Sequence, residues 1–200
     1  YKRQILKSAS GNASRALSEF SMIRFKGALT PLNTTLSDLQ MKSDKYQRLL
    51  VRISPLLPIL PDLLGNNIKR TYFVAMQNSA QARGTGGLLG TFALITFNKG
   101  AISLDYVAPN SELEIQPDIP IAVPNEYRTI YQDYAKSWNG SNFSPHFPYA
   151  AQIWAETWRR MTGQEVDGVI SVDTFVLRAL LAATGPIKIE NYEITRENVI

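Results

Sequence analysis

An arginine stands within the most glycine-dense stretch of the chain, between an apolar run at 71–76 and another at 91–97. Glycine lets backbone N–H groups approach an anion closely, and the planar guanidinium of arginine matches phosphate or carboxylate. The stretch therefore predicts a polar, ligand-binding loop between two strands. Its candidate ligand-binding residues are Asn78, Arg83, Gly84, Thr85, Gly86 and Gly87.

The spacing of these glycines excludes two common nucleotide sites. A dinucleotide fingerprint needs G-x-G-x-x-G, but the position that follows Gly84 and Gly86 in that pattern holds Leu89, and Gly90 comes one place late. A Walker A loop needs Lys-Ser or Lys-Thr after its glycines, and neither pair follows here. The predicted loop is therefore neither of these phosphate-binding motifs.

Few residues are available for other kinds of catalysis. The chain has no cysteine and one histidine, His146, which excludes disulfides, thiolate chemistry and metal sites built on sulfur or on several histidines. One histidine without a nucleophile elbow does not indicate a Ser-His-Asp triad. We interpret His146 as an exposed loop residue.

Charge is distributed unevenly along the chain. Residues 1–52 carry ten Lys or Arg and three acidic residues, a net charge of +7, whereas the rest carries 11 basic and 14 acidic residues, a net charge of −3. A basic segment beside a mildly acidic domain favours an anionic surface such as lipid headgroups or polymer phosphates. The basic residues are thinly spread with few aromatics between them, so nucleic acid is not the expected partner.

The first third of the chain is expected to be helical. Thr30 and Pro31 form a helix start signal, a heptad-like apolar stripe follows between 32 and 53, and prolines at 55, 58 and 61 end it. We predict a basic helical segment over 1–64 and an α/β core domain over 65–200. No apolar run approaches the roughly 20 residues that span a bilayer, and the chain begins without methionine. We interpret it as a soluble piece of a longer protein whose anchor lies outside these residues.

Strands and helices alternate beyond residue 64. The expected strands are 71–76, 91–97, 101–107, 166–173 and 187–189, with a hairpin turn at 98–100, and the expected helices are 126–138, 149–161 and 174–183. The proline-rich stretch 108–125 predicts a long surface loop. This order predicts an α/β fold in which helices sandwich a mixed sheet. Trp154 and Trp158, four residues apart, are expected in the core.

Five ordered motifs resemble one family. They are LPDLLGNNIKRTYFVAMQN, ARGTGGLLGTFALI, NFSPHFPYAAQ, VDGVISVDTFVLRALLAATGPI and ITRENV. Over about residues 58–200, their order and spacing resemble the bacterial envelope-associated family known as domain of unknown function 4012. That family in turn resembles the LytR–CpsA–Psr proteins, which attach glycopolymers to peptidoglycan from a polyprenyl-pyrophosphate-linked donor, often with Mg²⁺.

The second likeness implies a protein on the extracytoplasmic face of the bacterial cell membrane. It would bind a polyprenyl-phosphate-linked glycan or anionic polymer and transfer it to the cell wall, with Mg²⁺ as cofactor. Such transfer needs cationic groups on the phosphates and usually a divalent metal. The residues implied are Arg83 and Asp105 as catalytic groups, Arg128, Phe143 and Phe147 as further ligand contacts, and Asp105 with Asp167 as metal ligands. We interpret Asp173 as the N-cap of the next helix.

Three positions depart from the patterns of these families. Asn78 and Gln81 stand where carboxylates are usual, and His146 stands where an aspartate is common. A site without those carboxylates would hold Mg²⁺ poorly, because affinity rises with the charge of the ligands. A non-catalytic binding or scaffold domain of the envelope is therefore the alternative to a transferase. A structural module whose basic helices dock on a partner or membrane is a third reading.

Overall fold

The computed structural model describes residues 55–56 and 58–200, together with ten single positions before them. The chain divides into two units, Tyr1–Leu63 and Leu64–Ile200. In the first unit, helix α3 (Leu60–Leu63) carries Pro61 in its first turn, where the missing N–H of proline removes no helical hydrogen bond. The predicted start signal at Thr30 and the apolar stripe that follows it lie outside the described residues.

The second unit is built on a four-stranded mixed sheet. Its strands are β1 (Arg70–Arg83), β2 (Gly86–Asn98), β3 (Ala101–Pro109) and β4 (Gly168–Asp173), in the order β3-β2-β1-β4. β1 and β2 pair antiparallel, as do β2 and β3, whereas β4 runs parallel to β1. Two further strands, β5 (Ile187–Ile189) and β6 (Tyr192–Ile194), form a separate hairpin. The prediction of an α/β fold with a mixed sheet is confirmed.

The two hairpins of the sheet differ in how well the sequence predicts them. Lys99 and Gly100 both have positive φ, 50° and 86°, as a tight two-residue hairpin turn requires, so the predicted turn is confirmed. The prediction of a loop over residues 77–90 is wrong, because most of these residues are in strands. These residues extend β1 and β2 into a hairpin arm whose turn is Gly84 and Thr85. The polar side chains are accommodated because most of this arm runs beyond the buried core, and its pairing shifts register twice, after Met76 and after Asn78.

Helix α5 (Phe147–Thr162) covers one face of the sheet. Its inward side chains recur at helical spacing, and they include Trp154 and Trp158, which are 1% and 7% exposed. Phe73 and Phe92 from neighbouring strands stack 5.0 Å apart beneath them. The prediction that both tryptophans are core residues is confirmed. Gly163, with φ of 73°, ends the helix in the left-handed conformation.

A second hydrophobic cluster fastens the segment between β3 and α5. Ile119, Tyr127, Ala135 and Ile153 are all buried in it. The expectation of a surface loop over 108–125 is therefore wrong for its middle part, which follows the short 3₁₀ helix η2 (Asn110–Glu112) and packs inward. The apolar side chains outweigh the proline signal because Leu113 is buried in the cluster beneath α5 and Ile119 is buried in the second cluster.

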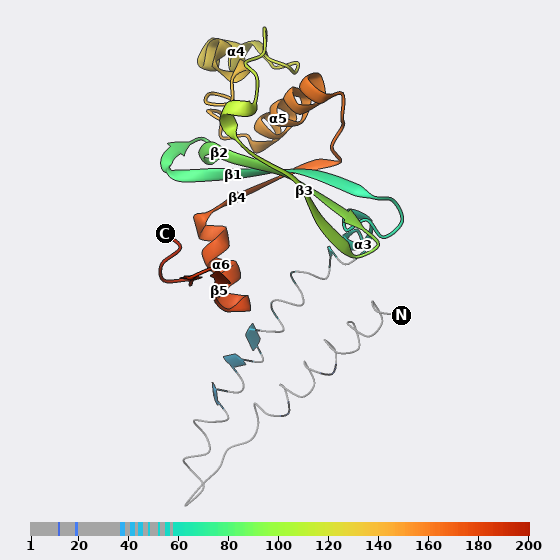
Figure 1. Ribbon diagram of the computed structural model, residues 1–200, viewed down its shortest axis with the longest axis vertical. Helices are drawn as coiled ribbons and strands as arrows, with labels where there is room; N and C mark the ends of the chain where they lie inside the picture. The colour runs from blue at the N-terminus through green and yellow to red at the C-terminus, as the bar shows by residue number, and fades with distance from the viewer. Residues whose placement is uncertain are drawn as a thin grey trace, which may run out of the picture. The chain divides into compact units, whose positions relative to one another are not determined.

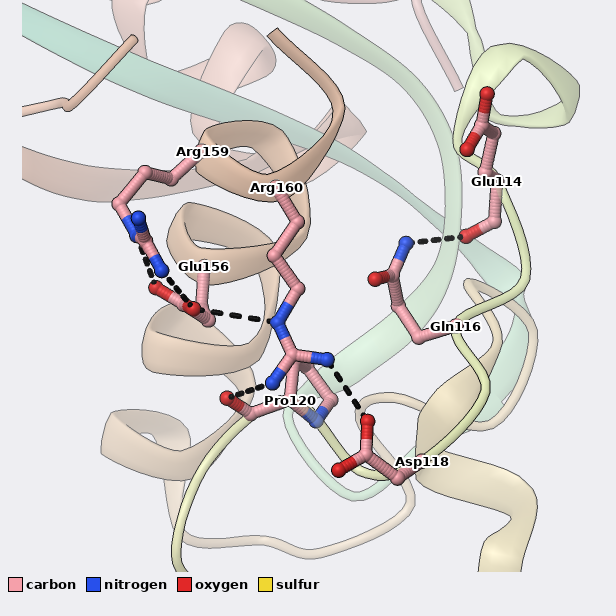
Figure 2. A network of polar contacts seen from close by, with 7 residues as sticks. All are labelled: Glu114, Gln116, Asp118, Pro120, Glu156, Arg159 and Arg160. Atoms are coloured by element: carbon pink, nitrogen blue, oxygen red, sulfur yellow. Dashed lines mark hydrogen bonds and ion pairs between the residues drawn. The ribbon is translucent and has the colours of Figure 1, made fainter. Parts of the chain in front are cut away.

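Arg160 adds polar contacts to the same segment. Figure 2 shows its guanidinium between Glu156, Asp118 and the carbonyl of Pro120, with nitrogen-to-oxygen distances of 3.2, 2.8 and 3.2 Å. Arg159 points to the other side of Glu156 and forms a bidentate pair with its carboxylate. One arginine of the pair thus joins α5 to the segment, whereas the other bonds within the helix.

The predicted helix at 126–138 is shorter than expected. Helix α4 (Asn125–Tyr131) ends where Gln132 takes a positive φ of 49°, and the 3₁₀ helix η3 (Gln132–Lys136) continues in a new direction. Tyr127 and Tyr131 of α4 face the second cluster, and Ala135 of η3 is fully buried in it. The break lets both short elements bury a side chain against α5.

The other side of the sheet carries helix α6 (Thr174–Thr184), which follows β4 directly. Figure 1 shows α4 and α5 on one side of the sheet, and α6 and β5 on the other. Several large apolar residues on this side are exposed, among them Ile102 and Leu104 of β3, Ile170 of β4 and Leu180 of α6. Among the described residues, no helix combines the length and apolar character that crossing a bilayer requires.

Candidate functional site

The turn of the β1–β2 arm lies against the loop that precedes α5. A Cβ atom on Gly84 would stand 2.3 Å from the carbonyl oxygen of Phe143 and 2.6 Å from the nitrogen of Pro145. Such distances are too short for any side chain, so glycine at 84 is needed for the close approach of two backbones. The glycine that the sequence suggested for anion binding therefore has a packing role as well.

A buried polar network joins this turn to the loop. Asn142 is fully buried and donates from Nδ2 to the Thr85 hydroxyl, at 3.0 Å, and to the Gly87 carbonyl, at 2.8 Å. Gln77, which is 6% exposed, donates from Nε2 to the same hydroxyl at 2.8 Å. Buried polar groups need partners, and the two amide nitrogens find one in the Thr85 hydroxyl, whereas Asn142 Oδ1 has none among the described residues. The network fixes the side chain of Thr85.

Arg83 lies beside the turn, with its guanidinium over an aromatic ring. Its Cζ is 5.1 Å from the centre of the Phe143 ring, and its Nε donates to the Asn139 carbonyl at 3.2 Å. A second nitrogen, Nη1, donates to the carbonyl of Ala82 at 3.0 Å. Stacking on an aromatic face and bonding to main-chain oxygens hold the guanidinium in place. Arg83 is thus a positioned cation.

A pocket of about 530 Å³ opens next to this turn, at the carboxyl ends of β1 and β4. In open sheets with parallel strands, ligands bind outside those ends. Its lining residues come from the turn, the loop before α5, β4 and the start of α6; they are Gln77, Gly84, Thr85, Pro145, Phe147, Ser171, Val172, Asp173 and Val176. Its volume is within the range of small-molecule sites.

Asp173 stands where β4 becomes α6. One of its oxygens, Oδ1, accepts a hydrogen bond of 2.8 Å from the backbone N–H of Val176, so the prediction of an N-cap is confirmed. The same side chain also lines the pocket. The sequence predicted the structural role, whereas the place of Asp173 in the pocket depends on how β4 pairs with β1.

Asp105 and Arg83 are not brought together. Asp105 lies on β3 near the register of Ile95, which pairs with Tyr72 of β1. Arg83 pairs with Gly86, which is nine residues from Ile95 on β2, so at about 3.3 Å per residue Arg83 and Asp105 lie roughly 30 Å apart along the sheet. The predicted catalytic pair therefore does not share one site.

Asp105 and Asp167 are both held at the far end of the sheet by donors. Hydrogen bonds from Thr96, and then from Ser103, hold the pKa of Asp105 below its ordinary value. Partial burial raises the pKa of Asp167, but the Thr71 N–H and Arg70 outweigh this effect and lower it. Arg70 pairs with Asp167 at 2.6 Å. These carboxylates already have protein partners in the arrangement.

Of the described residues, no three His, Asp or Glu side chains are grouped so that they could hold a metal ion. Asp105 and Asp167 share an end of the sheet, where the hydroxyls of Thr71 and Thr96 lie 3.0 Å apart between them. Neither carboxylate lines the pocket. Mg²⁺ binding by this pair stays a prediction, and its place is separate from the pocket.

The remaining predicted contacts are divided between the site and its surroundings. Phe147 lines the pocket, while Phe143 supports Arg83. Arg128 lies on α4 and acts electrostatically on Asp118, away from the lining residues. Asn78 is exposed at the irregular part of β1, where its side chain accepts from the Ala80 N–H. His146 is exposed and packs edge-on against Tyr149, as expected of a loop residue.

Residues 67–200 match the profile of a family described as protein of unknown function, DUF4012. The chain belongs to this family. The family resemblance seen in the five sequence motifs is thereby confirmed, and the DUF4012 region contains the whole sheet, the polar network and the pocket. No curated protein and no solved structure matches the chain. The likeness of DUF4012 to LytR–CpsA–Psr proteins stays a prediction.

Sequence reasoning missed two central residues of this DUF4012 site. Gln77 was the first residue of the predicted polar loop and had no role of its own there, and Asn142 looked like one polar residue among several in a turn-rich loop. The Asn, Gly and Ser residues around Asn142 indicated a turn. Nothing local could indicate that it meets Thr85.

Proposed function

We propose that this DUF4012 chain binds a phosphate-bearing, lipid-linked glycan of the polyprenyl-pyrophosphate type at the extracytoplasmic face of the bacterial cell membrane. The observation that supports it most directly is that Arg83 and the pocket share one turn. Gly84 and Thr85, which follow Arg83 directly, line the cavity. A positioned guanidinium beside a partly apolar pocket suits a ligand with an anionic group and a bulkier portion.

The arrangement favours binding over transfer. Asp173 is the carboxylate among the described lining residues, and one of its oxygens already caps α6. General acid–base catalysis needs a group within hydrogen-bond reach of the reacting proton, and Asp105 lies far from Arg83. We therefore rank a non-catalytic binding domain ahead of a transferase. Transfer to the cell wall, an Mg²⁺ cofactor and a LytR–CpsA–Psr-like sandwich are the further parts of the proposal.

Calorimetric titration with farnesyl pyrophosphate, a soluble polyprenyl pyrophosphate, tests the proposal. Saturable binding to the 200-residue chain is expected, with a loss of about tenfold or more in Arg83→Ala, because a charge-assisted contact to phosphate is removed. Arg83→Lys keeps the charge but not the planar fork, so an intermediate affinity is expected.

Arg159→Ala is the charge-matched control, because Arg159 pairs with Glu156 near the other end of α5. Its affinity should equal that of the wild type. Equal affinities of wild type and Arg83→Ala would contradict the proposal. Repeating the titration with Mg²⁺ separates the two forms of the proposal, because affinity that rises with the metal supports a transferase-type site.

A further inference from the structure

With the Gln77 amide oriented as it is in the structure, the hydroxyl of Thr85 is left as a hydrogen-bond donor. A hydroxyl has one proton and two lone pairs. Both lone pairs of Thr85 Oγ1 are occupied, by Gln77 Nε2 and by Asn142 Nδ2. The amide of Asn142 cannot be reversed, because its nitrogen also bonds the Gly87 carbonyl, which can only accept. The remaining proton of Thr85 is therefore free to point into the pocket, which Thr85 lines.

The pocket also holds two acceptors. Gln77 lines the pocket and is buried, with 6% of its surface exposed. Its Nε2 is used by Thr85, while its Oε1 receives no hydrogen bond from the described residues. Asp173 pairs with Gln77 in the register of β4 and β1, so the two residues are neighbours at the pocket. Its Oδ1 caps the helix, and its Oδ2 receives no hydrogen bond from the described residues. An amide oxygen that no protein donor uses is an acceptor to which a ligand hydroxyl can donate.

The charge of the pocket disfavours an anion inside it. Among the described residues that line the cavity, Asp173 is the charged one, and the Arg83 guanidinium is turned onto Phe143. The oxygens of a pyrophosphate diester only accept hydrogen bonds at neutral pH, so such an oxygen could pair with Thr85 but not with Gln77 Oε1. It would also be repelled by Asp173.

A sugar hydroxyl has the opposite properties. It accepts and donates at once, so adjacent hydroxyls of one ring can accept from Thr85 and donate to Gln77 and Asp173. The remaining walls are partly apolar and include Phe147 and Val176, which suits the C–H face of a ring. The cavity of about 530 Å³ is large enough for a small polar ring.

We propose that this pocket holds a neutral, hydroxyl-bearing ring, a sugar unit, while the anionic group of the ligand stays outside it at Arg83. This division rests on the proposed function. It assigns the sugar of the ligand to the pocket and its phosphate to Arg83. Thr85 donates to the sugar, Gln77 and Asp173 accept from it, and Asn142 is a positioning residue that acts through Thr85.

The experiment is an NMR titration of the ¹⁵N-labelled 200-residue chain with separate probes. Glucose and N-acetylglucosamine represent the neutral ring, and inorganic phosphate represents the anion. Either sugar should shift the side-chain amide signal of Gln77 and the backbone signals of Thr85 and Ser171. Phosphate should shift the Nε–H signal of Arg83 and leave the Gln77 amide unchanged.

Three variants give the proposal its sharpest test. Asp173→Asn keeps an oxygen to cap α6 but removes the charge, so it should weaken sugar binding several-fold. If the pocket held an anion, the same variant would bind phosphate more tightly. Thr85→Val should weaken sugar binding by about five- to tenfold, whereas Thr85→Ser should retain it. Unchanged backbone spectra away from the site control for folding.

Several results would overturn the proposal. They are the absence of any saturable shift with both sugars, equal sugar affinity in Thr85→Val and wild type, and phosphate shifts at Gln77 that grow in Asp173→Asn. The proposed function fails separately. If sugars bind but farnesyl pyrophosphate does not, the sugar pocket stands and the lipid-phosphate proposal falls; if farnesyl pyrophosphate needs Arg83 and sugars do not bind, the reverse holds.

Discussion

Asn142 and Thr85 are joined by a hydrogen bond of 3.0 Å, although 57 residues separate them in the chain. This bond connects the loop before α5 to the turn of the β1–β2 arm, and the same amide nitrogen also bonds the Gly87 carbonyl. The contact holds the loop against a turn that lines the pocket, and it orients the Thr85 hydroxyl. The stability of the arm and the chemistry of the pocket are therefore coupled.

Gly84→Ala is expected to lower the free energy of unfolding by about 1–3 kcal/mol, because its Cβ would overlap the backbone of the facing loop. Urea denaturation measures the change. Gly90→Ala is the matched control on β2, since its nearest contact would be the Met76 oxygen at an ordinary 3.7 Å. It should change stability by about 0.5 kcal/mol or less. Equal effects of the two variants would contradict the close approach at Gly84.

Arg160→Ala is expected to destabilise the DUF4012 unit by about 1–2 kcal/mol, because it leaves the Pro120 carbonyl without its donor and frees the Asp118 segment from α5. Thermal or urea unfolding provides the measurement. Arg159→Ala removes the same type of side chain one position earlier, but its hydrogen bonds are exposed and run to Glu156 of the same helix, so little change in stability is expected. A larger loss in Arg159→Ala than in Arg160→Ala would refute this assignment.

Tyr127→Phe is expected to leave stability unchanged or raise it by about 0.5–1 kcal/mol. The hydroxyl of Tyr127 is buried without a hydrogen-bond partner among the described residues, and phenylalanine keeps the ring contacts with Tyr131 and Tyr149. Tyr134→Phe, at an exposed side chain, is the control and should have no effect. Destabilisation by more than about 1 kcal/mol would show that the hydroxyl is bonded.

Burial, and then the neighbouring Tyr131 and Tyr149, raise the pKa of Tyr127 to about 12. The folded state keeps this proton between the ordinary pKa of about 10 and the raised value, whereas the unfolded state loses it. The contribution of the Tyr127 phenol to the free energy of unfolding is therefore complete below about pH 10, and it is lost as the pH rises toward about 12. The pKa values of Tyr72 and Tyr106 are also raised, so an alkaline absorbance titration should show several late phenols in the wild type and one fewer in Tyr127→Phe. Identical titrations would reject the prediction.

Acid should destabilise the unit through Asp167 and Asp105, whose pKa values are held below the ordinary value of about 4. In that range the unfolded state binds more protons than the folded state, so stability is complete above the unfolded pKa and lost as pH falls through the folded values. The urea concentration at the midpoint of unfolding should decrease as the pH is lowered below about 4. The fall should be less steep in Asp167→Asn. An equally steep fall in both proteins would contradict the role given to the Arg70 ion pair.

Local patterns account for the parts of the fold that were predicted correctly. The Lys99-Gly100 turn follows from the need for two positive φ angles, and helix α5 follows from apolar spacing that ends at Gly163. The errors came where distant packing changed a local preference. Gln132 breaks the predicted helix so that Ala135 can be buried, and the polar stretch at 77–83 became a strand because β2 supplies its hydrogen bonds.

The sequence by itself determined the family, the α/β class, the tight turn of the second hairpin, the N-cap at Asp173 and the importance of the glycine stretch after Arg83. These depend on short-range backbone geometry and periodicity, which a linear pattern carries. The tertiary structure alone decided which polar groups meet. It paired Arg70 with Asp167, placed Asp105 far from Arg83, and directed Gln77 and Asn142 to one hydroxyl. Strand register and loop packing set those meetings over separations of 8 to 97 residues, and no local preference encodes them.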